Sequence, residues 1–242
     1  MQNDLAIGVK NSDRARYYSV LFAPKQHRDA LYTLYAFDAE IQRIPHLVSE
    51  PALGAIRLQW WIEGLAGERR EEMRTHPIGQ SMVDVRRQYN LPFDPLITLI
   101  EERVRLLLHS DHDALADEKA LESSFGKTHA VILHLAAFLL NEGLDPQTSD
   151  LSGHAGMVLG LIEVLRRQSL HIKQSDLIAL AFEHLEKARS LIKNSNAELL
   201  SVYLPLVGAH PFLKRAMRKD DAFKQREISD LYLLTRMVFG LI

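Results

Sequence analysis

The sequence contains no cysteine. This absence excludes disulfide bonds, thiolate nucleophiles, and zinc or iron–sulfur sites that use cysteine ligands, and it is typical of a protein from a reducing compartment. Only histidine and carboxylate side chains remain as candidate metal ligands.

A strong excess of charge of either sign is also missing. The 242 residues carry 29 basic and 31 acidic side chains, a formal net charge of −2. This balance gives no general attraction for a polyanion, so we expect no nucleic-acid partner. The first residues lack the basic and apolar regions of a secretory signal, and no apolar run reaches the roughly 18–20 residues that span a bilayer. We therefore expect a cytoplasmic protein, or a mitochondrial-matrix protein if the source is eukaryotic.

Alternation of β-branched residues is nearly absent, whereas apolar residues recur at helical spacing almost everywhere, which predicts an all-α fold. A long helix is predicted at about 25–46, and it should end or kink near Pro45, which disfavours helical geometry at Ile44. A second helix is predicted to begin at Pro51 and to become less stable near Gly64. The linkers are short, so we predict a single domain over the whole chain. Further helices are predicted at roughly 77–90, 94–109, 117–142, 149–171, 175–193, 197–217 and 226–241.

The predicted helix at 149–171 has small residues at spacings that let a neighbouring backbone approach closely, which indicates a central helix. These residues are Gly153, Ala155, Gly156 and Gly160. The last apolar segment, LYLLTRMVFGLI, carries Arg236 and allows two interpretations. We favour a last helix docked on the core over an interfacial membrane anchor.

Some local patterns are set aside. FGKT at 125–128 ends like a phosphate-binding loop, but the earlier glycine is missing at Leu121 and the segment looks helical. His129 and His134 lie five positions apart, a poor spacing for one helical face, and we interpret both as core or surface histidines. No serine lies in the G-x-S-x-G pattern of an α/β-hydrolase.

Several separated segments, in order along the chain, resemble the squalene/phytoene synthase-like family. They are RYYSVLFAPKQHRDALYTLYAF at 16–37, IRLQWW at 56–61, RRQYNLPFDPLITLIEER at 86–103 and LGLIEVLRR at 159–167. The resemblance implies an isoprenoid synthase-type bundle of helices around a central cavity. Enzymes of the family are expected to join two prenyl diphosphates head to head, with two aspartate-rich motifs that face each other and hold magnesium.

The aspartates of both motifs are replaced in this chain. The positions of D-D-x-x-D and of N-x-x-R-D-x-x-x-D hold, in order, Gln42, Arg43 and His46, and then Glu163, Arg166, Arg167 and His171. Magnesium needs several oxygen ligands, and a cation in place of an acid repels it. We therefore expect no catalytic residue, no metal and no cofactor, as in a pseudoenzyme. Two interpretations of the bases stay open: they bind an anion in the cavity, or they form surface pairs with neighbouring acids.

The stretch AFDAEIQRIPHLVSEPALGAIRLQWW resembles one branch of the family in particular, the mitochondrial complex I assembly factor and its bacterial relatives. This resemblance implies a binding role in assembly of respiratory complex I. The implied partner is a protein such as a respiratory complex subunit, with peripheral contact at the inner membrane. The exchange of acids for bases in both motifs separately predicts that the cavity binds a phosphorylated lipid, a prenyl diphosphate or an acidic segment of a partner without metal. The alternative is a working squalene/phytoene synthase-type prenyltransferase acting on prenyl diphosphates, and magnesium is expected only in that case.

Arg57 and Trp60 lie on the second predicted helix and are candidates to line the family cavity. Each has an ordinary structural explanation beside this one. A tryptophan at helical spacing is commonly a core side chain, and Arg57 could pair with a carboxylate such as Glu50.

Overall fold

The computed structural model describes residues 2–109, 114–167, 172–218 and 228–239. No residue in these ranges lies in a β-strand, so the predicted all-α class is confirmed. The α-helices are α1 (Gln2–Ser12), α2 (Arg14–Val20), α3 (Arg28–Arg43), α4 (Pro51–Ala66), α5 (Arg70–Thr75), α6 (Gly79–Gln88), α7 (Phe93–Leu108), α9 (Glu118–Phe125), α10 (Val131–Leu140), α11 (Ser149–Arg167), α12 (Gln174–Ile192), α13 (Leu200–Tyr203), α14 (Ala209–Met217) and α15 (Asp230–Val238).

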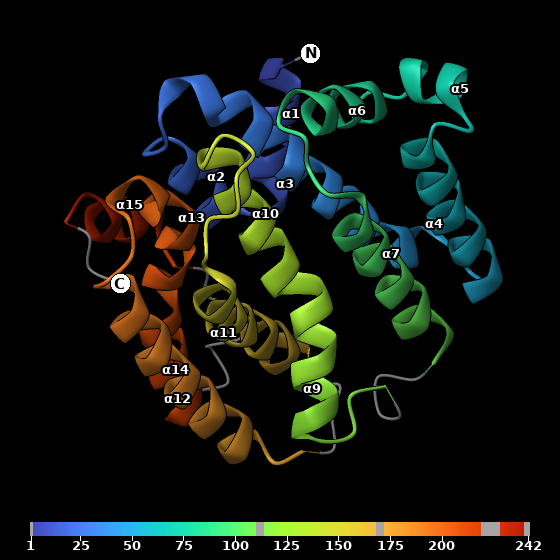
Figure 1. The fold of residues 1–242 in the computed structure, drawn as a ribbon. Coiled ribbons are helices and arrows are strands. Elements are labelled where there is room, and N and C mark those ends of the chain that lie inside the picture. Colours follow the sequence, from blue (N-terminus) through green and yellow to red (C-terminus); the bar gives the residue numbers. More distant parts are fainter. Residues whose placement is uncertain (1, 110–113, 168–171, 219–227, 240–242) are drawn as a thin grey trace.

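Short turns of tighter or wider helix join several of these elements. The 3-10 turns are η1 (Lys25–His27), η2 (Ile44–Leu47), η4 (Ala197–Leu199) and η5 (Leu204–Gly208), and η3 (Gly126–Ala130) is a π-helical turn. In Figure 1, α9, α10 and α11 occupy the middle of the molecule, with α12 and α14 on one side and α7 and then α4 on the other.

The first two predicted helices are confirmed with adjusted ends. The segment predicted at 25–46 is η1 followed by α3, and the chain changes to the 3-10 turn η2 where Pro45 stands. Helix α4 begins at Pro51, and Gly67 ends it in the left-handed conformation with φ of +92°. Glycine adopts this conformation without steric cost, which is why it commonly ends helices.

The helix predicted at 117–142 is confirmed over 118–140, with the π turn η3 inside it. The prediction at 197–217 was wrong, because that stretch is divided into η4, α13, η5 and α14 around Pro205. Proline removes a helical hydrogen bond and clashes with the preceding turn, which explains the break. Helices α1, α2 and α5 were not predicted. The end of the helix predicted at 149–171 lies outside the described residues after Arg167.

The core is one contiguous cluster of buried apolar side chains contributed by helices from α1 to α14. Helix α3 is central to it, since Leu34, Tyr35 and Phe37 are each no more than 1% exposed. Residues 118–140 are long and apolar enough to cross a membrane by length and composition, which the sequence interpretation had not found. Because 67% of that stretch is buried within the fold, it has the environment of a core helix.

Helix α15 docks on the rest of the molecule through one face. Leu233 and Met237 are buried in a small second cluster with Tyr18, Leu204 and Val207. The opposite face leaves large apolar side chains exposed, namely Leu231, Val238 and Phe239. The segment is therefore a helix docked on the core through its buried face, as predicted. Its other face is an exposed apolar surface.

The predicted close approach at α11 is present at two of its glycines. A Cβ atom at Gly156 would lie 2.5 Å from the backbone nitrogen of Ala130 in η3, and one at Gly160 would lie 2.5 Å from the ring of Phe125. Real Cβ atoms do not approach other atoms so closely. At Gly156 the neighbour is backbone, which cannot yield without moving a helix. At Gly153 a Cβ would meet nothing within 4 Å, so that position has no such role.

Two histidines meet where α11 packs on α12. The Nδ1 atoms of His154 and His184 lie 2.9 Å apart, and His184 is only 5% exposed. One imidazole can donate to the other only while at least one of the two rings is neutral. Burial, together with nearby positive charge, lowers the pKa of both rings below the usual 6.5.

We predict that Gly156→Ala destabilises the fold by about 1–3 kcal/mol, because the added methyl group forces η3 away from α11. Gly153→Ala is the matched control in the same helix. It should change stability by less than about 1 kcal/mol and in the stabilising direction, since alanine is the better helix former where there is room. Urea unfolding followed by circular dichroism measures both. Equal effects at the two positions would contradict the close-packing explanation.

We also predict a loss of stability as the pH falls below about 6.5. The unfolded chain takes up protons on His154 and His184 from that pH, whereas the folded pair resists until its lower pKa values are reached, so acid favours unfolding. Unfolding free energies measured between pH 5 and 7.5 should show a steeper slope for the wild type than for His184→Gln. The exposed histidine variant His109→Gln should keep the wild-type slope. A His184→Gln slope equal to that of the wild type would refute the assignment.

Candidate functional site

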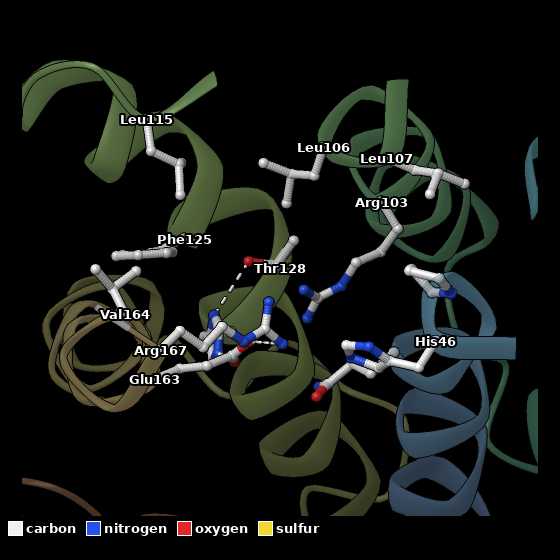
Figure 2. A pocket seen from close by; sticks show the side chains of 13 residues that line it. His46, Arg103, Leu106, Leu107, Leu115, Phe125, Thr128, Glu163, Val164 and Arg167 are labelled. Atoms are coloured by element: carbon white, nitrogen blue, oxygen red, sulfur yellow. Dashed lines mark hydrogen bonds and ion pairs between the residues drawn. The ribbon is translucent and has the colours of Figure 1, made fainter. Parts of the chain in front are cut away.

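A cavity of about 170 Å³ lies between the end of α3, η2, α7, the end of α9, η3 and the C-terminal part of α11 (Figure 2). Both polar and apolar side chains line it. The polar ones are Gln42, His46, Arg103, Thr128, His129, Glu163 and Arg167, and the others are Pro45, Leu106, Leu107, Leu115, Phe125 and Val164.

The cavity brings together both of the substituted motifs. Gln42 and His46 reach it from α3 and η2, and Glu163 and Arg167 reach it from α11. Each pair is four positions apart, which is the spacing that puts two side chains on one helical face. In Figure 2, His46 and Arg167 approach the cavity from opposite sides.

Two bases of the same motifs point elsewhere. Arg43 is exposed and pairs with Glu40 at 2.8 Å, and the guanidinium of Arg166 lies over the ring of Phe212 at 5.1 Å. Consecutive residues on a helix are about 100° apart, so neither base can share the face of its neighbour in the cavity. Neither lines the cavity, and the expectation that they belong to an anion site was wrong for this cavity. His171 lies outside the described residues.

Arg57 and Trp60 do not line this cavity either. Arg57 is exposed on α4. The indole nitrogen of Trp60 donates to Glu72, and its ring packs against His76. Helix α4 lies outside α7 (Figure 1), so it is separated from the cavity, which explains why the expected lining role was wrong.

Three cavity residues were missed or set aside at the sequence level. Arg103 ends the segment RRQYNLPFDPLITLIEER, which was used only as a family signal. Thr128 belongs to FGKT, and its neighbour His129 was interpreted as a core or surface histidine. FGKT does form helix rather than a phosphate loop, and Lys127 approaches Glu102 at 3.8 Å.

The π turn η3 is the reason why Thr128 and His129 both face inward. A π turn contains one extra residue, and such insertions are common at functional positions in helices. Thr128 is 1% exposed and His129 is 7% exposed. Regular helical periodicity gives no signal for this turn, so the sequence pattern could not reveal it.

A buried ion pair supports the α3 side of the cavity. Arg16 Nη1 donates to Asp38 Oδ2 at 2.5 Å, and the side chains are 8% and 1% exposed. The amide of Gln42 donates to the same oxygen at 2.8 Å. Burial alone would raise the pKa of Asp38, but the charges of Arg16 and Arg103 outweigh it and keep the pKa below its usual value. Asp38 is therefore an anion that already has its partner.

Glu163 is the only carboxylate among the described residues that line the cavity. His129 Nε2 lies 2.9 Å from its Oε2, and Arg167 Nη2 lies 2.6 Å from its Oε1. Burial would raise the pKa of this carboxyl group, yet the hydrogen bond and charge of His129, with Arg103 and Arg167, hold the pKa well below its ordinary range. Both carboxylate oxygens are thus occupied by bases from this chain.

His129 is held through both of its ring nitrogens. Its Nδ1 lies 3.2 Å from the hydroxyl oxygen of Thr128, whose own proton is donated to the carbonyl oxygen of Ser124 at 2.8 Å. These contacts fix the orientation of the ring, with Nε2 directed at Glu163 and Nδ1 directed at Thr128.

Arg103 is a buried cavity base without a close partner in the described part of the chain. It is 8% exposed, its Nε has no hydrogen bond, and its guanidinium points into the cavity in Figure 2. The charge of Arg103 contributes to lowering the pKa values of Asp38 and Glu163, but both carboxylates are already paired with other bases.

The donor set does not fit a magnesium ion. Magnesium takes six oxygen ligands and binds proteins through one or two carboxylates that are free to coordinate it, whereas the described lining of this cavity offers one carboxylate that two bases already occupy. Within the described ranges, no group of three or more histidine and acidic side chains is arranged to hold a metal ion.

Comparison with known proteins agrees with the geometry. A family model described as squalene/phytoene synthase matches residues 9–176, which is more than half of the chain. Curated relatives include NADH dehydrogenase (ubiquinone) complex I, assembly factor 6, from Homo sapiens and from Bos taurus. Each is 22% identical over 245 residues, an alignment that covers 88% of this chain and 72% of the relative.

We predict that Asp38→Asn destabilises the protein by about 3–5 kcal/mol, because it leaves the buried charge of Arg16 without an anion. Glu40→Gln is the matched acid-to-amide control, since its pair with Arg43 is exposed and should contribute no more than about 1 kcal/mol. Chemical denaturation at neutral pH measures both variants. A loss at Glu40 as large as the loss at Asp38 would contradict the assignment of the buried pair as the one that matters.

Proposed function

The chain belongs to the squalene/phytoene synthase family, and we propose that it acts within that family by binding rather than by catalysis, in the assembly of respiratory complex I. The observation that carries the proposal is the state of Glu163. Among the described residues it is the sole carboxylate in the cavity where the two motifs meet, and His129 and Arg167 occupy both of its oxygens.

The chemistry of diphosphate departure explains why this observation matters. Ionising an allylic diphosphate places negative charge on the leaving group, and hard divalent cations held by several carboxylates stabilise that charge. In this cavity the corresponding positions present an amide, an imidazole and a guanidinium, which coordinate magnesium poorly or repel it. These groups suit recognition of a molecule better than heterolysis of its diphosphate bond.

The printed names of the relatives supply the specific process. Assembly factor 6 of complex I in Homo sapiens and Bos taurus aligns with 88% of this chain. By this similarity we propose a respiratory complex subunit as protein partner, and a location at the inner membrane, in mitochondria or in a bacterium. The exposed apolar face of α15, with Leu231, Val238 and Phe239, is a surface suited to peripheral membrane contact.

The function is tested by two measurements on one set of proteins. Purified protein with farnesyl or geranylgeranyl diphosphate and Mg²⁺ should release diphosphate no faster than a protein-free sample, with a catalytically active family member as positive control. In the source organism, deletion of the gene should lower the amount of assembled complex I on native gels, and the wild-type chain should restore it.

Turnover of either substrate that Glu163→Gln abolishes would overturn the non-catalytic proposal in favour of a prenyltransferase. A normal amount of complex I in the deletion strain would overturn the assembly role. The two outcomes are independent, because the first concerns chemistry in the cavity and the second concerns the process that the protein serves.

A further inference from the structure

The cavity has an excess of positive charge that the described residues do not neutralise. Arg103 and Arg167 line it and are permanently charged, whereas Glu163 is the only carboxylate among its described lining residues, so one net positive charge remains among them. Asp38 does not change this balance, because Arg16 pairs with it directly.

Arg103 makes this excess unusual, because the charge is inside the protein. Burying an ionised group without a partner is costly, and buried arginines are normally paired. Arg103 is 8% exposed, makes no close ion pair within the described ranges, and has its guanidinium aimed into the cavity in Figure 2. An anion entering the cavity would provide the partner that the chain itself does not.

The surrounding donors suit an anion with several oxygens. A guanidinium presents a planar fork of N–H groups that matches two phosphate oxygens, and such charge-assisted bonds are among the strongest in proteins. Gln42 and His46 on the α3 side and Arg167 on the α11 side bring further N–H groups to the rim. The cavity of about 170 Å³ is several times the roughly 30 Å³ that one water occupies, so a phosphate group fits.

The remaining wall is apolar, which indicates what the anion is attached to. It is formed by Leu106, Leu107, Leu115, Phe125 and Val164. A free inorganic ion would gain nothing from these side chains, whereas a hydrocarbon attached to a phosphate would be removed from water against them.

We infer that this cavity binds the phosphate group of an amphipathic ligand directly, without a metal ion, and that Arg103 is its principal contact. The inference deepens the proposed function and rests on it, since it names the ligand of a cavity that binds and does not ionise. Prenyl phosphates and phospholipids share this chemistry, and the experiment separates them.

The test is calorimetric titration of the purified protein in EDTA with three probes: farnesyl diphosphate, short-chain phosphatidic acid and inorganic pyrophosphate. At least one amphiphile should bind in the micromolar range, and more tightly than pyrophosphate. Tighter binding of farnesyl diphosphate would identify a prenyl ligand, and tighter binding of phosphatidic acid would identify a lipid. No binding at high micromolar concentration, loss of binding on chelation, or equal affinity for pyrophosphate would overturn the inference.

Arg103→Met should raise the dissociation constant at least about tenfold, because it removes the charged fork from the centre of the cavity. Arg166→Met is the matched control on α11, since the same charge is removed from a position over Phe212 and outside the cavity. Its dissociation constant should stay within about twofold of the wild type. Equal weakening by both variants would show a general charge effect and refute the site.

Thermal melting gives a second reading that separates a ligand contact from a structural residue. Without ligand, Arg103→Met should melt at the same temperature as the wild type or higher, because an unpaired buried charge has been replaced by an apolar side chain. The rise in melting temperature that the ligand causes in the wild type should be lost. A variant that melts lower without ligand and still gains from it would overturn the role of Arg103.

The result is distinguishable from a failure of the proposed function. A protein that neither turns over prenyl diphosphates nor binds a phosphate amphiphile keeps the proposed function and loses this inference. A protein that ionises farnesyl diphosphate with Mg²⁺ loses the proposed function, whatever it binds in EDTA.

Discussion

The contact between α11 and η3 sets the position of the acid–base pair of Glu163 and His129 in the cavity. Gly156 lets the backbone of Ala130 approach so closely that no side chain fits between them, and Gly160 receives the ring of Phe125. One helical turn further along α11, Glu163 meets His129, which η3 presents inward. A larger residue at Gly156 would separate the two elements and with them the acid and the base that define the cavity.

The cavity shows how a site for metal-bound diphosphate changes when its acids are replaced. Glu163 begins the second motif and is the one acid at the substituted positions that still faces the cavity, and two bases hold it. The other acid of the region, Asp38, is buried one turn earlier on α3 and pairs with Arg16. Both carboxylates therefore serve the protein's own bases, and Arg103 is left to face the cavity with its charge. The two motifs still face each other across the cavity, but bases stand where the family motifs have acids.

Prediction from the sequence succeeded where a local pattern fixes the outcome. The three-and-four spacing of apolar residues predicted α3, α4 and α11, because residues at that spacing lie on one face of an α-helix, where they can be buried together. Prediction failed for η3, because an extra residue in a helical turn gives no signal in the apolar periodicity. It also failed for the break at Pro205, which lies inside an otherwise helical stretch. Arg43 and Arg166 were grouped with the cavity by motif alone, and helical rotation directs them to solvent and to Phe212.

The sequence by itself determined the fold class, the family resemblance and the loss of the motif aspartates, because residue identity and periodicity are local properties of the chain. Only the tertiary structure decided which bases share a cavity. Arg16, Arg103 and His129 are far apart from one another along the chain, and no spacing rule relates them. Their roles follow from packing, which pairs Arg16 with Asp38 and His129 with Glu163 and leaves Arg103 buried without a close partner in the described part of the chain.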